Sequence, residues 1–341
     1  MNRKALRMNL SFLFAAALLL TSCAQAAPTQ APAPEEPAAS TAGEEYIYVS
    51  MMGNLEFFNA HKYGFKWAGE ALGVTATYVG PPDFDVNAQV AAFDQAIAKK
   101  PKGIVVFAVD PSLIPEIDKA TDAGIPVVTI LGDLPTSKRI AFVGSYQYDL
   151  GYVGGTHLAE SLGGQGKVAI LSIPGTQMFD DREAGFRAAF EAYPGIEVVQ
   201  VGDTKADTAT AISVAKDILT RNPDLAAFVG TDSTAGIGAA TAVSEAGKSA
   251  EVKTVSMDRN SDVLQAIQNG TLTGTVAQDD AAMAFWALQT LYNYVHNQAP
   301  LTVDNAKAGA STGPTIVYMS VNYIDKSNLQ YYLDANQLYT Q

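Results

Sequence analysis

One sequence pattern occurs twice in this chain. In its first copy, Pro101 precedes a continuous apolar run that leads to Asp110, and in its second copy Pro223 precedes a run that leads to Asp232, with the same nine-residue spacing. Each copy continues with a segment that predicts a helix closing at Ala-Gly, and then with another apolar run. Uninterrupted apolar runs of this length are typical of buried parallel strands. The repetition therefore predicts an α/β fold with two similar lobes, each built on a doubly wound parallel sheet.

Aspartates follow the predicted strands of both copies. The second strand of the first copy, 127–131, is followed by Asp133, and that of the second copy, 253–257, is followed by Asp258. A single aspartate in such a position is ordinarily a helix cap or a turn former. Four of them in register indicate a ligand site, because ligands of open α/β sheets bind at the carboxyl edge of the strands. The predicted strand-end acids are Asp110, Asp133, Asp232 and Asp258.

Residues 1–22 have the features of an export signal. A basic start is followed by an apolar stretch from Leu10 to Leu20, which is too short to cross a bilayer as a mature helix. Small residues precede Cys23, the only cysteine of the chain, as in the lipobox of bacterial lipoproteins. We therefore expect cleavage before Cys23 and lipidation there, the alternative being a lone cysteine in a cleaved signal peptide. Residues 23–44 then form a disordered tether, because they are rich in Ala, Pro, Thr and Glu.

Charge and composition limit the classes of partner. The chain carries 22 Lys and Arg against 35 Asp and Glu. Removal of residues 1–22, which hold three basic residues and no acid, leaves 19 against 35, a formal charge of −16. This balance argues against nucleic-acid binding and against a polybasic contact with a membrane. With a single cysteine, no disulfide can form within the chain.

The remaining residues, about 295, are too many for one typical compact core and fit two domains. The chain is expected to cross between the lobes near Tyr146, near Gln278 and in 306–313, where Gly309 and Gly313 can absorb backbone rotation. The first lobe is predicted to comprise 45–145 and 279–306, and the second 146–278 and 307–341.

Catalytic, metal and cofactor motifs are missing from the sequence. The residues His61, His157 and His296 lie far apart without ligand spacing. There is no Gly-x-Ser-x-Gly, no Cys-His pair and no Gly-x-Gly-x-x-Gly after the first predicted strand. The Gly-rich segment 163–167 is not a phosphate loop, because Ser161 stands where such a loop has its first Gly. We therefore expect no catalytic residue, metal or cofactor, although a pair of carboxylates acting as in glycosidases stays open.

Five short motifs occur together in the region that the repeat spans. They are Phe57-Phe58 after the first predicted strand, Arg-Glu-Ala-Gly-Phe at 182–186, Thr-Asp at 231–232, Met-Asp at 257–258 and Val-Ala-Gln at 276–278. Each motif alone is weak, and together they are specific. Over nearly all of 45–300 the chain resembles the periplasmic solute-binding proteins of the ribose-binding type, the sugar-capturing components of ATP-driven importers.

The resemblance implies a role for each matching residue. Phe57 and Phe58 would sandwich a sugar ring, Arg182 and the second-lobe aspartates would hold its hydroxyls, and Gln278 would add a hydrogen bond at the hinge. Sugars have apolar C–H faces that stack on aromatic rings and a rim of hydroxyls that charged groups bind strongly. The predicted ligand-binding residues are Asn54, Phe57, Phe58, Asp110, Asp133, Arg182, Asp232, Asp258 and Gln278.

The chain departs from the ribose pattern at three places. Ala108 and Leu131-Gly132 stand where ribose-type proteins have Asn and an Asp-Arg pair, with Asp110 and Asp133 two residues further on. Ala206 stands where those proteins have a second-lobe Phe. The loss of one Arg and one aromatic side chain predicts a more acidic and roomier pocket. This change argues against ribose and against an anionic ligand. A hexose, a polyol such as inositol and an amino-substituted sugar all remain open.

The predicted function is that of an extracytoplasmic lipoprotein anchored to a membrane through Cys23. It would capture a neutral monosaccharide or polyol by hinge closure and deliver it, as a monomer, to an ABC permease with cytoplasmic ATPases. LacI-type repressors share this fold, but they need an N-terminal helix-turn-helix where this chain has an export signal. A secreted lipoprotein hydrolase that uses the cleft carboxylates and a signal-molecule receptor of the same fold remain as alternatives.

Overall fold

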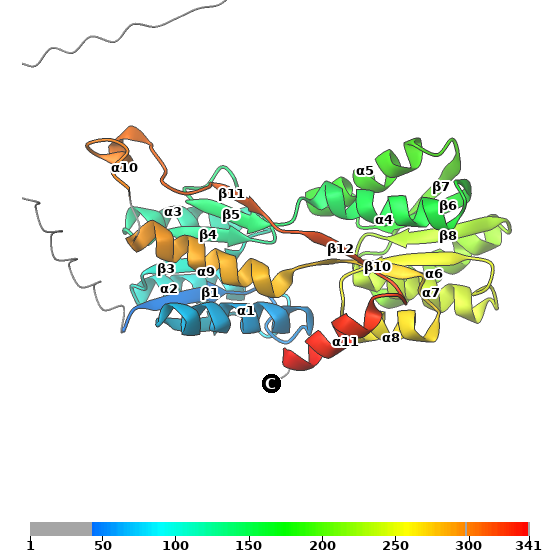
Figure 1. Ribbon diagram of the computed structural model, residues 1–341, viewed down its shortest axis with the longest axis horizontal. Coiled ribbons are helices and arrows are strands. Elements are labelled where there is room, and N and C mark those ends of the chain that lie inside the picture. Colours follow the sequence, from blue (N-terminus) through cyan, green and yellow to red (C-terminus); the bar gives the residue numbers. More distant parts are fainter. Residues whose placement is uncertain (1–42, 297–298, 340–341) are drawn as a thin grey trace, which may run out of the picture. The chain divides into compact units, whose positions relative to one another are not determined.

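Two six-stranded sheets organise the computed structural model, which describes residues 43–296 and 299–339 (Figure 1). The first sheet contains β1 (Glu45–Val49), β2 (Thr75–Val79), β3 (Gly103–Phe107), β4 (Val127–Ile130), β5 (Ala141–Gly144) and β11 (Ile316–Tyr318). The second contains β6 (Gln165–Ser172), β7 (Gly195–Asp203), β8 (Leu225–Gly230), β9 (Lys253–Met257), β10 (Gly274–Gln278) and β12 (Val321–Ile324). Their orders are β11-β5-β4-β3-β1-β2 and β12-β10-β9-β8-β6-β7. The pairs are parallel except for β10 with β12.

Helices cover both faces of the first sheet. The helices of this lobe are α1 (Phe57–Leu72), α2 (Val86–Ala98), the short 3-10 helix η1 (Pro111–Leu113), α3 (Ile114–Asp122), α9 (Asp280–His296) and α10 (Asn305–Ala308). Successive side chains of a strand point to opposite faces of its sheet. In β1, Tyr46 and Tyr48 belong to the core that includes α1 and α9, whereas Ile47 and Val49 belong to the core that includes α2 and α3. All four are fully buried, which is why this strand carries large apolar or aromatic side chains on both faces.

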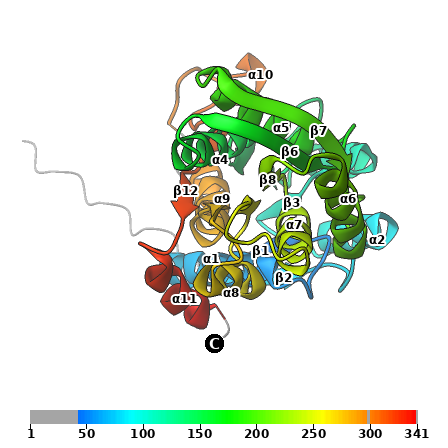
Figure 2. The same ribbon diagram turned by 90° about the vertical axis from the view of Figure 1, so that its right-hand side faces the viewer.

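The second lobe repeats this arrangement. Its helices are α4 (Gln147–Ser161), α5 (Gln177–Glu191), α6 (Thr208–Arg221), α7 (Ser233–Glu245), α8 (Ser261–Asn269) and α11 (Leu329–Leu338). One face of the sheet carries α4 and α5, and the other carries α6 and α7 (Figure 2). A Cβ atom at Gly151 of α4 would lie 1.9 Å from the backbone oxygen of Arg182 in α5, so only glycine fits there. This close approach brings the start of α5, and Arg182 with it, against the start of α4.

The two copies of the sequence repeat occupy matching places in the two sheets. Neighbouring strands β3 and β4 are connected through η1 and α3, and neighbouring strands β8 and β9 are connected through α7. Both connections run from one parallel strand to the next, which brings the carboxyl ends of the strands to one edge of each sheet. The predicted α/β fold of two doubly wound, parallel-dominated lobes is confirmed.

The chain passes between the two sheets at three places. Strand β5 leads into α4 at Ser145-Tyr146, and β10 leads into α9 at Asp279. The third crossing connects β11 to β12 at Met319-Ser320, and Figure 1 shows these strands as one C-terminal segment that continues from one sheet to the other. Short crossings of this kind are where domain motions are absorbed.

The position of β11 differs from the predicted domain boundary. The sequence interpretation assigned all of 307–341 to the second lobe and put the third crossing in 306–313. Instead, Ile316–Tyr318 pair in parallel with Phe142–Gly144 at the edge of the first sheet. The assignment is therefore wrong for β11, because its backbone hydrogen bonds complete the outer side of β5.

The predicted export signal, residues 1–22, and Cys23 lie outside the described residues, as does most of the predicted tether 23–44. Strand β1 begins at Glu45, which is where the sequence predicts the start of the folded region. Within 43–296 and 299–339, no helix combines the length and the apolar character that crossing a membrane requires.

Candidate functional site

A buried guanidinium lies at the centre of the candidate site. Arg182 in α5 is 4 % exposed. It donates one hydrogen bond from Nη1 to the backbone oxygen of Thr231 (2.7 Å) and one from Nε to Oε1 of Gln147 (2.8 Å). Burial lowers its pKa, and three carboxylates oppose this effect. These carboxylates belong to Asp258, Asp232 and Asp280.

Asp232 follows β8 and serves as the N-cap of α7. Its Oδ1 accepts hydrogen bonds from the backbone N–H of Ala235 (2.8 Å) and from the hydroxyl of Thr234 (2.6 Å). Its Oδ2 is buried and has no hydrogen-bond partner among the described residues. One oxygen therefore stabilises the helix start, while the other is left for a ligand.

Asp258 follows β9 in an unusual backbone conformation. Its φ is +67°, a left-handed region in which Asp is tolerated better than most side chains. Its N–H donates to the oxygen of Val276 (2.8 Å), and its own carbonyl accepts from the hydroxyl of Thr275 (2.8 Å). Neighbouring strand β10 thus holds the backbone that aims this carboxylate.

The environment raises the pKa of Asp258 to about 6. Burial is the largest cause, and the negative charges of Asp280 and Asp232 act in the same direction. The charge of Arg182 and a hydrogen bond with Ser233 lower the pKa but do not cancel these effects. Arg182 and Ser233 therefore compensate the negative charge of these carboxylates only in part.

Asp280, the first residue of α9, is a further acid that the sequence interpretation did not include. It is 4 % exposed, and its Oδ1 lies 3.5 Å from Nε2 of the fully buried His61. The other ring nitrogen of His61 lies 3.3 Å from the hydroxyl of Tyr48. An acid in the first turn of a helix is ordinarily explained by the helix dipole, so nothing in the sequence distinguished Asp280.

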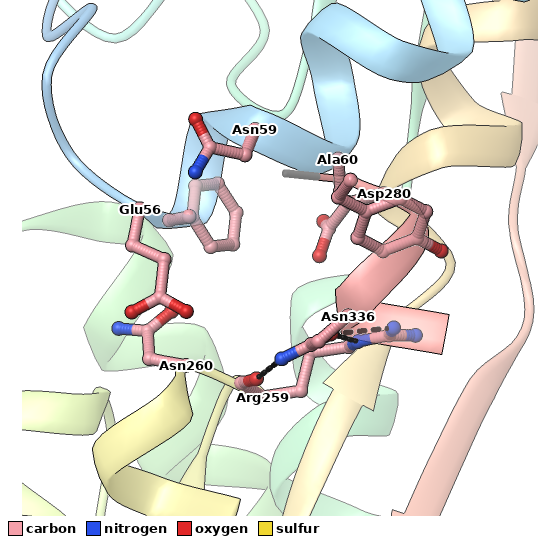
Figure 3. Close-up of a pocket in the computed structure, with 9 residues that line it drawn as sticks. Glu56, Asn59, Ala60, Arg259, Asn260, Asp280 and Asn336 are labelled. Atoms are coloured by element: carbon pink, nitrogen blue, oxygen red, sulfur yellow. Dashed lines mark hydrogen bonds between the residues drawn. The ribbon is translucent and has the colours of Figure 1, made fainter. Parts of the chain in front are cut away.

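A pocket lined by residues of both lobes includes Asp280 (Figure 3). The other members of the charge cluster, Arg182, Asp232 and Asp258, are not among its lining residues, and neither is Gln278. Figure 3 shows the carboxylate of Asp280 pointing into the pocket. Its free volume is about 20 Å³, which is room for about one water molecule. Across it, Glu56 of the first lobe accepts hydrogen bonds from the backbone N–H and the hydroxyl of Ser261 at the start of α8. The pocket is lined by Glu56, Phe57, Asn59, Ala60, Arg259, Asn260, Asp280, Asn336 and Tyr339.

The C-terminal helix α11 forms one wall of this pocket. Arg259 donates to Oδ1 of Asn336 from Nη2 (2.8 Å), and Asn336 donates back to the carbonyl of Arg259 (2.9 Å). The guanidinium also lies 5.2 Å from the ring centre of Tyr332 and 5.0 Å from that of Tyr339. The ring of Tyr339 contacts Tyr63 of α1 at 5.3 Å. The Tyr-rich tail therefore fixes the residue next to Asp258 and contacts both lobes.

The two predicted aromatic residues lie in different environments. Phe57 is half-buried and lines the pocket. Phe58 is 1 % exposed and packs in the first-lobe core, with its ring 5.6 Å from Phe107 and 5.5 Å from His61. Adjacent residues of a helix point in different directions, so the structure brings only the first of this pair to the pocket.

Asp133 bonds to residues of its own lobe and not to the acids of the second lobe. It forms an ion pair with Arg139, whose Nη2 donates to Oδ2 at 2.6 Å. Its Oδ1 accepts from the hydroxyl of Thr129 (2.8 Å). Both oxygens are thus engaged within the first lobe, and the structure does not place Asp133 in the pocket.

Leu131 occupies the place in the first lobe that Asp258 occupies in the second. Its φ is +64°, and its N–H bonds the oxygen of Val143 on the next strand, as that of Asp258 bonds Val276. Asp133, which the sequence already placed two residues beyond this strand end, is therefore not the counterpart of Asp258. Strand ends are set by the backbone conformation, which the spacing of apolar residues does not reveal.

Asp110 and Asn54 form hydrogen bonds with nearby residues of the first lobe. Oδ1 of Asp110 accepts from the backbone N–H of Ser112 (2.8 Å) and caps η1, and bonds from Ser112 lower the pKa of this carboxyl. Asn54 is exposed, and its backbone N–H donates to the oxygen of Pro82 (2.8 Å). Neither residue lines the pocket between the lobes.

Gln278 ends β10 at the second crossing. It is 2 % exposed, and its Oε1 is buried without a hydrogen-bond partner in the described part of the chain. A buried acceptor without a partner costs free energy. A hydrogen-bond donor on a ligand would remove this cost at Oε1 of Gln278. No group of three or more His, Cys, Asp or Glu is arranged for a metal ion within the residues that the structure describes.

Residues 47–299 match the model of the periplasmic binding protein domain family. The chain belongs to this family. The match spans both lobes and the first two crossings, and the resemblance inferred from the five motifs is confirmed. One relative of this periplasmic binding protein is the D-ribose/D-allose-binding protein of Pseudomonas aeruginosa, 26 % identical over 300 residues that cover 84 % of this chain and 91 % of the relative.

Solved structures show the same two-lobed fold. An arabinose-binding protein from Geobacillus stearothermophilus, AraP, superposes with a TM-score of 0.79 at 31 % identity and covers 85 % of this chain and 99 % of its own. The sugar-binding protein of a sugar ABC transporter from Bacillus halodurans superposes with a TM-score of 0.80, with the same identity and coverage. These two structures each match 85 % of this periplasmic binding protein and 99 % of their own chain.

The raised pKa of Asp258 predicts how ligand-free stability depends on pH. Between about pH 4 and 6 the carboxyl of Asp258 is protonated in the folded protein and ionised in the unfolded chain. Asp258 therefore lowers the stability of the fold as the pH rises through this range. The substitution Asp258→Asn should keep the backbone conformation, because Asn, like Asp, tolerates a left-handed φ. We expect the variant to be more stable than the parent by about 1–3 kcal/mol at pH 7.5 and nearly equal to it at pH 4.

Chemical denaturation without ligand at these two pH values measures the difference. Exposed Asp149 of α4 offers a control, since Asp149→Asn changes the same formal charge on the surface. An Asp258→Asn protein that is less stable than the parent at pH 7.5 would contradict the electrostatic cost assigned to this carboxylate.

Proposed function

We propose that this protein is the extracytoplasmic substrate-binding component of an ABC importer and captures a monosaccharide or polyol between its lobes. The observation that carries the proposal is the charge cluster around the buried Arg182. It contains Asp232 and Asp258, which follow the parallel strands β8 and β9, and Asp280, which lines a pocket together with Phe57. Carboxylates accept hydroxyl hydrogen bonds strongly, and an aromatic ring stacks on the apolar face of a sugar. The names of the relatives support this class of ligand, since they include ribose-, allose- and arabinose-binding proteins.

The relatives also support transport rather than catalysis. A sugar ABC transporter supplies one of the similar structures. A transport protein releases its ligand unchanged, so the proposed role needs no catalytic residue and no cofactor. Delivery to a permease with cytoplasmic ATPases and action as a monomer are part of the proposal.

Affinity measurements with single-residue variants test the site. Calorimetric titration with neutral monosaccharides and inositol should identify a ligand that binds at a ratio of one per chain and is recovered unchanged. Asp258→Asn should then weaken binding by about 2–3 kcal/mol, because hydrogen bonds to a charged group become bonds to a neutral one. This change corresponds to roughly 30- to 150-fold in Kd. Phe57→Ala should weaken binding through lost stacking.

Asp83→Asn provides the matched control, because this exposed acid lies in the turn between β2 and α2 and should leave the Kd within twofold of the parent. An Asp258→Asn protein that binds within threefold of the parent would remove the strand-end site from the proposal. Turnover of the sugar would instead favour a secreted hydrolase that uses these carboxylates.

We also propose that the lobes close on the ligand. Residues of both lobes line one pocket, which supports this, because a ligand there would contact both lobes at once. The contact of Glu56 with Ser261 supplies an interaction that separation would break. Small-angle scattering should show a smaller radius of gyration after saturation with a tight ligand. An unchanged radius would rule out closure.

The third element of the proposal is lipid anchoring at Cys23 after removal of residues 1–22. The lipobox-like sequence before the single cysteine supports it. Cys23→Ala should release the protein from the membrane fraction, because a tether that carries Glu35, Glu36 and Glu44 and no basic residue cannot bind an anionic membrane without lipid. A Cys23→Ala protein that stays in that fraction after a high-salt wash would contradict this anchoring.

A further inference from the structure

The site between the lobes contains more negative than positive charge. Three carboxylates, those of Asp232, Asp258 and Asp280, interact with one guanidinium, that of Arg182. The pocket is also lined by Glu56, which is bonded to Ser261. Buried charges are stable only when they are paired and hydrogen-bonded. The protein's own groups therefore leave an excess of negative charge at this site.

The two arginines of the site form their hydrogen bonds with neutral groups. Arg182 donates to Thr231, Gln147 and the sulfur of Met178. The guanidinium of Arg259 is bonded to Asn336 on α11. His61 lies 3.5 Å from Oδ1 of Asp280, a contact that is an ion pair only when the ring is protonated, and neither atom has a hydrogen-bond partner among the described residues.

Three hydrogen-bond acceptors of the candidate site are buried and unpaired in the described part of the chain. Oδ2 of Asp232, Oδ1 of Asp280 and Oε1 of Gln278 are buried and have no hydrogen-bond partner among the described residues. The carboxylate of Asp280, 4 % exposed, points into the pocket in Figure 3. All three atoms accept hydrogen bonds, and none can donate one while the carboxylates are ionised. The ligand must therefore supply donors, and a positive charge would match two of the three acceptors.

We infer that the ligand carries an ammonium group beside its hydroxyls, as in an amino sugar or an amino-substituted polyol, and that Asp280 binds this group together with the second-lobe acids. The inference rests on the proposed binding function and selects one of the ligand classes that the sequence left open. An ammonium group offers three donors and one positive charge, whereas a hydroxyl offers one donor and no charge. Once closure excludes water, the interaction with buried carboxylates becomes stronger than it is in solution.

The raised pKa of Asp258 agrees with this charge balance, because the negative charges of Asp280 and Asp232 contribute to it. The groups that act on this carboxyl are Arg182 from α5, Asp232 and Ser233 at the start of α7, and Asp280 from α9. A cation bound among them would lower the pKa of Asp258. The amine should therefore bind more weakly as the pH falls from 7 to 5 and Asp258 takes up a proton.

Matched sets of three compounds test the inference on the unmodified protein. Each set contains an amine, its neutral parent and its N-acetyl derivative: glucosamine, galactosamine, mannosamine and an amino-inositol provide four sets. N-acetylation keeps the nitrogen and removes the charge. We expect at least one amine to bind tenfold or more tightly than both of its partners at pH 7, with the advantage decreasing at pH 5.

The variant Asp280→Asn identifies the residue responsible. It should reduce the ratio of amine to parent affinity about tenfold, because both ligands lose a charged hydrogen-bond acceptor but only the amine also loses a partner for its positive charge. Asp149→Asn, which removes the same charge from the exposed side of α4, should leave the ratio within twofold. An unchanged ratio in Asp280→Asn would overturn the role of this carboxylate.

The possible outcomes separate the inference from the function on which it rests. If a neutral sugar binds as tightly as its amine in every set, the inference is wrong and the proposed function stands. If no compound binds in these sets or in the neutral panel, both are wrong. Because the comparison of compounds uses the parent protein, it decides the question even if Asp280→Asn fails to fold.

Discussion

The buried guanidinium of Arg182 connects the parts of the molecule that form the site. Its hydrogen bonds reach Gln147 at the start of α4 and Thr231 after β8. Glycines at the contact of α4 with α5 bring the helices close enough for this geometry. A cation at this depth needs negative partners, and the acids at the strand ends need the cation in turn. The strand-end acids and Arg182 therefore depend on each other, and the packing of the second lobe fixes the positions of both.

This arrangement couples ligand binding to the separation of the lobes. Water can satisfy the free oxygens of Asp232, Asp280 and Gln278 while the lobes are apart, but closure of an empty site would remove that water without replacing it. Each unmade hydrogen bond to such a group costs about 1–3 kcal/mol. A ligand with enough donors removes this penalty. The same atoms thus oppose closure of the empty protein and favour closure around a ligand, which is the differential affinity that a population shift requires.

The architecture was predictable from the sequence because buried parallel strands and amphipathic helices leave periodic patterns, and because the pattern occurs twice. Arg182, Asp232 and Asp258 were identified through their motifs, and the structure brings their charges together. The strand-end acids of the first lobe were misplaced because local conformation decides where a strand ends. Leu131, not Asp133, has the left-handed backbone. Asp280 was missed because its environment depends on His61, which tertiary packing alone brings beside it.

The C-terminal helix contributes to the site through the backbone of the loop that follows β9. A non-glycine residue with positive φ, such as Asp258, carries a strain of about 1–3 kcal/mol. Bonds to Val276 and Thr275 hold that conformation from the neighbouring strand, and α11 holds the next residue, Arg259, through Asn336 and two tyrosine rings. Restraint from both sides fixes the direction of the carboxylate before a ligand arrives. The carboxylate of Asp258 is then already ordered in the folded protein, so ligand binding loses less conformational entropy.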